Sequence, residues 1–136
     1  MGDLSKDFSC WEFKCHCGCG FDNVDIRLIK NLQAVRDKAD RKVIINSGCR
    51  CKNQNLREGG APNSMHLYGM AADIAIPGIP VRDVYMLVKD FPEFMGIGVS
   101  GIGGFVHVDV RRVQARALWT YINGRPAPWV EPEIEA

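Results

Sequence analysis

Residues 105–110 read FVHVDV, a stretch in which apolar and polar side chains alternate. Alternation with a period of two is typical of a β-strand, so the three valines share one face, and His107 and Asp109 lie on the other face together with Phe105. The valine face suits a hydrophobic core. We therefore expect the face that carries His107 and Asp109 to look toward a cleft or a partner.

The segments around this strand predict the rest of the sheet. A run at 95–99 and the strand 105–110 flank the glycine turn 101–104, and this pattern predicts a β-hairpin. Two further β-branched or apolar runs predict strands over 42–47 and 71–76, and a last one predicts an edge strand over 118–122.

Two stretches carry the periodicity of amphipathic helices. The first covers 24–39, where Asp22 or Asn23 is expected to cap the helix, and the second covers 81–91 after Pro80. The stretch 48–66 is rich in turn-forming residues and is expected to be a long loop, which inside a compact domain is usually functional. The order of elements predicts a small α+β domain with helices packed on a mainly antiparallel sheet.

The length of 136 residues is enough for one domain, 1–136, with a Cys-rich N-terminal segment (1–22) and a surface tail (125–136). With 17 Lys+Arg against 16 Asp+Glu, the chain lacks the basic excess of a nucleic-acid binder or of a polybasic membrane anchor. We find no signal peptide and no apolar run of about 18 residues, and we therefore expect synthesis in the cytoplasm, no membrane association and a monomer.

Histidine and aspartate residues form a second notable pattern. His66 opens the run HLYGMAAD, in which Asp73 lies inside an otherwise apolar strand. A carboxylate in that position is costly unless it is paired or binds a metal. Together with His107, these residues can provide three ligands for a zinc ion and leave a fourth position open, which suits a hydrolase.

The pattern Ser64-x-His66-x-x-Gly69-x-Ala71-x-Asp73, followed by Phe-x-His107-x-Asp109, resembles the zinc D-alanyl-D-alanine peptidases. This group includes peptidoglycan carboxypeptidases and phage endolysins, and it shares its fold with hedgehog signalling domains. INSGCR, which ends in Arg50, and NLREGGAPNS at 55–64 are similar to further segments of the family. The resemblance covers about residues 5–116.

The resemblance implies a role for several residues. His66, Asp73 and His107 would bind Zn²⁺, and Ser64 would hold the substrate or orient the first histidine. Arg50 would pair with a substrate carboxylate or with the oxyanion of the tetrahedral intermediate, as its planar guanidinium allows.

One position departs from the family pattern. Many members carry Glu or Asp three residues before the last histidine ligand, or His two residues before it, and this chain has Gly104 and Phe105 there. Asp109 lies on the same strand face as His107, and it would act either as the general base or as a residue that orients a ligand imidazole. The missing base leaves a second hypothesis, a non-catalytic zinc-binding module of the hedgehog type that binds cell wall or protein.

The cysteines gather at the N-terminus and beside Arg50: Cys10, Cys15, Cys17, Cys19, Cys49 and Cys51. Three interpretations stay open. The thiols form disulfides, they hold a second, structural metal with the help of His16, or they are buried free thiols. We assign no pairing.

The sequence thus predicts a zinc metallopeptidase that hydrolyses the stem peptides of peptidoglycan, as a carboxypeptidase or an endopeptidase. A phage or prophage lytic enzyme, released by the lysis machinery or carried on a virion to the bacterial cell wall, fits the resemblance. The identity of the cleaved bond is left open.

Overall fold

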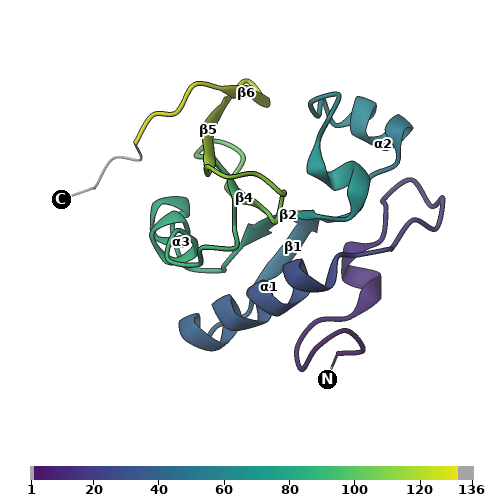
Figure 1. Ribbon diagram of the computed structural model, residues 1–136, viewed down its shortest axis with the longest axis horizontal. Helices are drawn as coiled ribbons and strands as arrows, with labels where there is room; N and C mark the ends of the chain where they lie inside the picture. The colour runs from purple at the N-terminus through teal and green to yellow at the C-terminus, as the bar shows by residue number, and fades with distance from the viewer. Residues whose placement is uncertain (1, 132–136) are drawn as a thin grey trace.

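The computed structural model describes residues 2–131 and contains one six-stranded sheet with the strand order β1-β2-β4-β3-β5-β6 (Figure 1). The strands are β1 (Ile44–Ser47), β2 (Ala71–Ala75), β3 (Gly96–Ser100), β4 (Phe105–Asp109), β5 (Ala117–Ile122) and β6 (Arg125–Ala127). The helices are α1 (Ile26–Ala39), α2 (Lys52–Arg57) and α3 (Val81–Val88), with short 3₁₀ turns η1 (Cys10–Phe13) and η2 (Met65–Tyr68).

Neighbouring strands are antiparallel except for β3 and β5, which run parallel. The predicted α+β class with a mainly antiparallel sheet is confirmed, and so is the hairpin formed by β3 and β4. Because β5 pairs with β3 and not with β4, the chain must pass from the end of β4 to the other side of β3. The segment 110–116 makes this connection.

The hydrophobic core lies on one face of the sheet. Val106 and Val108 of β4 are fully buried there, as their alternation predicts, against Leu28 and Leu32 of α1 and Val88 of α3. The N-terminal segment adds the buried rings of Phe8 and Phe13, whose centroids are 6.0 Å apart. Because the core fills this face, the opposite face of the sheet is left for polar side chains.

Both predicted helices have shifted ends. The cap of α1 is Asp25 rather than Asp22 or Asn23, and its side chain accepts a hydrogen bond from the backbone N–H of Arg27. The helix α3 ends at Val88 instead of residue 91, because Phe91 precedes Pro92 and this position disfavours helical backbone.

The prediction of a long loop over 48–66 was wrong in part, since this stretch contains α2 and the start of η2. The helix α2 begins at an unusual cap, the thiol of Cys51, which accepts a hydrogen bond from the N–H of Gln54. A cysteine is not among the usual capping residues, so the sequence carried no recognisable start signal.

The C-terminal region extends the sheet. The strand β5 was predicted at an edge, but it lies between β3 and β6, and the turn at Asn123 and Gly124 has the two positive φ angles of a tight hairpin. The segment predicted as a surface tail thus begins with β6, and its residues 132–136 lie outside the described part of the chain.

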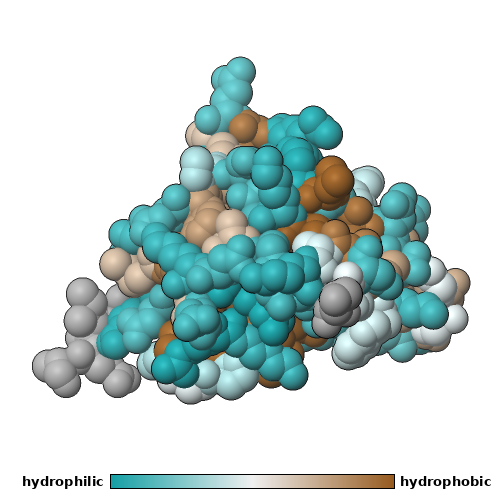
Figure 2. Space-filling model, turned by 90° about the horizontal axis from the view of Figure 1, so that it is seen from below, coloured by the Kyte–Doolittle hydropathy of each residue, from teal (hydrophilic) through white to brown (hydrophobic). Residues whose placement is uncertain are grey.

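The face seen in Figure 2 is largely hydrophilic, with apolar side chains gathered in limited areas. Within residues 2–131, no helix has the length and apolar character needed to cross a bilayer.

A single arginine fixes the connection into β5. The guanidinium of Arg116 donates hydrogen bonds to the carbonyl oxygens of Lys89, Phe91 and Phe94, each over 2.8 Å. These carbonyls belong to the turns that follow α3, so one side chain ties the start of β5 to the end of the helix layer.

We predict that Arg116→Ala lowers the free energy of unfolding by about 2–3 kcal/mol, because three backbone carbonyls lose a charged donor. Urea unfolding measures the change, with Arg112→Ala, an exposed arginine four residues earlier, as the control that stays within about 0.5 kcal/mol of wild type. Equal effects of the two substitutions would contradict this role of Arg116.

Candidate metal centre

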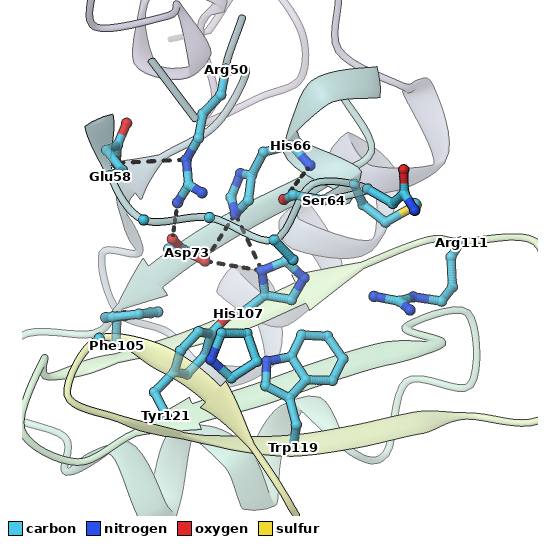
Figure 3. Close-up of a pocket in the computed structure, with 17 residues that line it drawn as sticks. Arg50, Glu58, Ser64, His66, Asp73, Phe105, His107, Arg111, Trp119 and Tyr121 are labelled. Carbon is cyan, nitrogen blue, oxygen red and sulfur yellow. Dashed lines mark hydrogen bonds and ion pairs between the residues drawn. The ribbon is translucent and has the colours of Figure 1, made fainter. Parts of the chain in front are cut away.

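The polar site is built on one row of residues across the sheet. In the strand register, Asp73 of β2 pairs with His107 of β4, His107 with Gly98 of β3, and Gly98 with Trp119 of β5. Residues paired in register point to the same face, so these side chains share the face opposite the core. The turn η2 places His66 above this row (Figure 3).

The three predicted metal ligands converge. Oδ1 of Asp73 lies 3.1 Å from Nε2 of His66 and 3.1 Å from Nδ1 of His107, and the two ring nitrogens are 3.2 Å apart. All three side chains are buried, as Figure 3 shows at the base of the pocket. Two nitrogens and one carboxylate oxygen directed at one point form the donor set of a three-ligand zinc site.

Hydrogen bonds on the far side of each ring orient the ligand nitrogens. Nδ1 of His66 lies 2.6 Å from the carbonyl oxygen of Gly48, so Nδ1 carries the proton and Nε2 keeps its lone pair. Nε2 of His107 lies 2.7 Å from Oδ2 of Asp109 and donates its proton there, which leaves the lone pair of Nδ1 for a metal ion. This second set of contacts is the usual support of metal-binding histidines, and the residues present therefore fit a zinc ion.

Asp109 is itself held in place. Arg111 donates through Nε to Oδ1 over 2.9 Å and through Nη2 to Oδ2 over 2.8 Å, and the Asp109 side chain is fully buried. It is not among the residues that line the pocket. Gly96, its register partner in β3, leaves room for it, because a Cβ at Gly96 would overlap the Asp109 carboxylate.

The pKa values of the three side chains shift in different directions. Burial would raise the pKa of Asp73, but its contacts with His66 and His107 hold it well below its usual range. Burial lowers the pKa of His66, which keeps this imidazole neutral, as a metal ligand must be. For His107, burial acts in the same direction, but hydrogen bonds to Asp109 and Asp73 raise its pKa overall.

Arg50 lies at the inner wall of the pocket. Its guanidinium donates to Oδ2 of Asp73 over 2.9 Å, to Ser47 Oγ over 3.0 Å and to Asn55 Oδ1 over 3.2 Å. These three bonds use three of the five N–H groups of the side chain. Since Arg50 lines the pocket, the others can serve a ligand.

Ser64 caps η2 and also lines the pocket. Its Oγ accepts a hydrogen bond from the backbone N–H of His66 over 3.3 Å. The structure therefore places Ser64 beside the backbone of His66 and in the lining of the cavity, and its role stays a prediction.

The pocket above the three ligands has a volume of about 340 Å³, in the range of small-molecule sites. One wall is aromatic, with Phe105 against Tyr121 at 5.2 Å between centroids and Trp119 against His107 at 5.0 Å. The other wall is the segment 58–65. Among the described residues that line the cavity, Asp73 and Glu58 carry carboxylates.

Sequence reasoning did not single out Glu58, Trp119 or Tyr121. Trp119 and Tyr121 alternate along a predicted strand, so a period of two could have placed them on one face. Glu58 had no such signal, since it follows a helix that was not predicted.

The six cysteines separate into two sets. Sulfurs of Cys15, Cys17, Cys19 and Cys51 all lie within 4.8 Å of one another. Cys10 instead donates its S–H to Asp22 over 3.2 Å, and Cys49 is buried. All six are free thiols, and His16 is exposed and not part of the group.

The fold thus combines a mainly antiparallel sheet with core helices on one face and a buried His₂Asp group that could hold a metal ion on the other. The profile of the Peptidase M15 family matches residues 6–109, and the chain belongs to this family. It is also 34% identical over 80 residues to the zinc D-Ala-D-Ala carboxypeptidase of Streptomyces albus G. That alignment covers 57% of this chain but only 31% of the relative.

We predict that Gly96→Ala weakens zinc binding by about 10–100-fold, because the added methyl group displaces Asp109 from His107. Gly101→Ala is the matched control, since a Cβ there meets no atom within 4 Å. Competition of both variants and wild type against a zinc-binding dye measures the affinity. Unchanged affinity in Gly96→Ala would show that Asp109 does not support the site.

Proposed function

We propose that this chain is a zinc-dependent peptidase that hydrolyses stem peptides of peptidoglycan, as a D,D-carboxypeptidase. The convergence of His66, Asp73 and His107 at the base of the cavity, with their ring nitrogens oriented by Gly48 and Asp109, is the observation that supports it most directly. Family membership and the relative named as a zinc D-Ala-D-Ala carboxypeptidase support the same activity.

Arg50 is suited to bind the substrate. When bound, a zinc ion polarises a carbonyl and lowers the pKa of water. The guanidinium of Arg50 lies 2.9 Å from Asp73, one of the three proposed metal ligands. Its remaining N–H groups are available for a terminal carboxylate or a developing oxyanion of the substrate. A cation in the pocket lining suits the carboxylate of a C-terminal residue, which favours the removal of that residue over cleavage within a long peptide.

We propose Glu58 as the group that takes the proton from the attacking water. It lines the cavity and lies beside Arg50, with Oε1 3.6 Å from Nε of Arg50 (Figure 3). Gly104 stands where relatives carry an acidic residue, and Glu58 can supply a carboxylate from another element.

Asp109 then acts as a positioning residue. Both its oxygens are occupied by His107 and Arg111, and burial keeps it from the cavity. Burial would raise its pKa, but the hydrogen bonds from Arg111 and His107 lower it well below its usual range, so it is a poor proton acceptor.

The activity is tested with purified, zinc-loaded protein and muropeptides, with mass spectrometry to identify the products. We expect loss of one D-Ala per stem pentapeptide, abolition by a chelator and recovery with Zn²⁺. His66→Ala should lose one equivalent of zinc and its activity. If the loaded wild-type protein releases no product, the non-catalytic hedgehog-type module is the better hypothesis.

The roles of the two carboxylates separate in a second experiment. Glu58→Gln should lower kcat by about 10²–10⁴-fold with zinc affinity unchanged, the range expected for a lost general base. Asp109→Asn should lower zinc affinity about 10–100-fold and regain much of its activity in excess zinc. The opposite pattern would make Asp109 the base.

The place of action and the cleaved bond are tested together on intact sacculi. A phage or prophage lytic endopeptidase cleaves cross-links and thereby lowers the turbidity of a sacculus suspension. A carboxypeptidase releases D-Ala and leaves the turbidity unchanged. We expect the second result. The monomeric state stays a prediction that light scattering can check.

A further inference from the structure

Four thiols from two distant parts of the chain meet at a second site. Sγ of Cys17 lies 3.5 Å from Sγ of Cys15 and 3.5 Å from Sγ of Cys51, and with Cys19 all four sulfurs lie within 4.8 Å of one another. A tetrahedral zinc ion with Zn–S bonds of about 2.3 Å separates its sulfurs by about 3.8 Å. The cluster therefore has the size of a tetrathiolate site.

Backbone N–H groups point at these sulfurs. The N–H of Cys19 donates to Cys17, the N–H of Cys51 to Cys15 and the N–H of Gln54 to Cys51, over 3.3 to 3.4 Å. Such donors stabilise negative charge on sulfur and are oriented here by the backbone alone. Three of the four sulfurs are thus already in contact with groups that favour the thiolate form.

The loop that carries three of the thiols is shaped for this arrangement. Gly18 and Gly20 have φ angles of +85° and +92°, in the region that side chains avoid. In extended backbone Cys17 and Cys19 would lie on one face about 7 Å apart. The left-handed turn at Gly18 between them brings their sulfurs closer together, within reach of Cys51.

We propose that Cys15, Cys17, Cys19 and Cys51 bind a structural Zn²⁺ ion as four thiolates. Sulfur ligands select a soft or borderline cation over Mg²⁺ or Ca²⁺, and four protein ligands leave no position for substrate. Each thiol releases its proton to solvent on binding, and no sulfur is oxidised.

This ion would connect the N-terminal segment to the active-site loop. Cys51 follows Arg50 directly, and the segments also meet where the N–H of Cys49 donates to the carbonyl of Phe13 over 2.8 Å. In Figure 1 the N-terminal segment runs beside the region of α2. The metal would thus fix the loop that positions Arg50.

Cobalt substitution tests the proposal on the full chain. Co²⁺ bound to four thiolates shows intense sulfur-to-metal charge-transfer absorption, which a His₂Asp site does not produce. We expect the reduced wild-type chain to bind two equivalents of Co²⁺, one of which produces this band and is displaced by Zn²⁺. Absence of the band in the wild-type chain would overturn the proposal, whether or not any variant folds.

Matched variants assign the band. Cys17→Ser should lose the band and one equivalent of metal, whereas Cys10→Ser, outside the cluster, should keep both. His66→Ala should keep the band while it loses the other equivalent, so the result does not depend on peptidase activity. Alkylation of the chain purified without reductant counts its free thiols. Two disulfides among the four cysteines would also overturn the proposal.

Discussion

A buried carboxylate in the middle of the sheet sets the conditions for everything around it. Asp73 lies in β2 among apolar neighbours, and its charge is tolerated only because both oxygens have partners. Oδ1 faces the two histidines and Oδ2 faces Arg50. The same residue therefore ties the proposed metal ligands to Arg50, the proposed substrate-binding cation, and neither can move without leaving charge unpaired in the interior.

The support continues along β4 in the other direction. His107 contacts Asp73 through one ring nitrogen and Asp109 through the other, and Asp109 in turn is held by Arg111. The guanidinium of Arg111 also stacks 5.1 Å above the ring of Trp119 in the pocket wall. A continuous series of polar contacts thus runs from Arg50 through the site to Arg111, and Arg111 also contacts the aromatic wall of the pocket.

Local patterns were sufficient for much of this architecture. The valine alternation in 105–110 predicted which face of β4 enters the core, and the cost of burying Asp73 pointed to a paired or metal-bound carboxylate. What sequence could not predict were contacts that depend on pairing distant segments. The parallel pairing of β5 with β3 brings Trp119 to His107, and the thiol cap of Cys51 starts the helix that precedes Glu58.

The groups that line the pocket come from two different parts of the sheet, and this separation affects which of them can be replaced easily. The proposed metal ligands come from β2, β4 and η2, near the centre of the fold, whereas Tyr121 and Pro126, which line the pocket, come from β5 and the edge strand β6. An edge hairpin tolerates substitution and changes of length better than a central strand does. Residues at the rim of the sheet can therefore be replaced at a lower cost to the fold than the residues of the proposed metal centre.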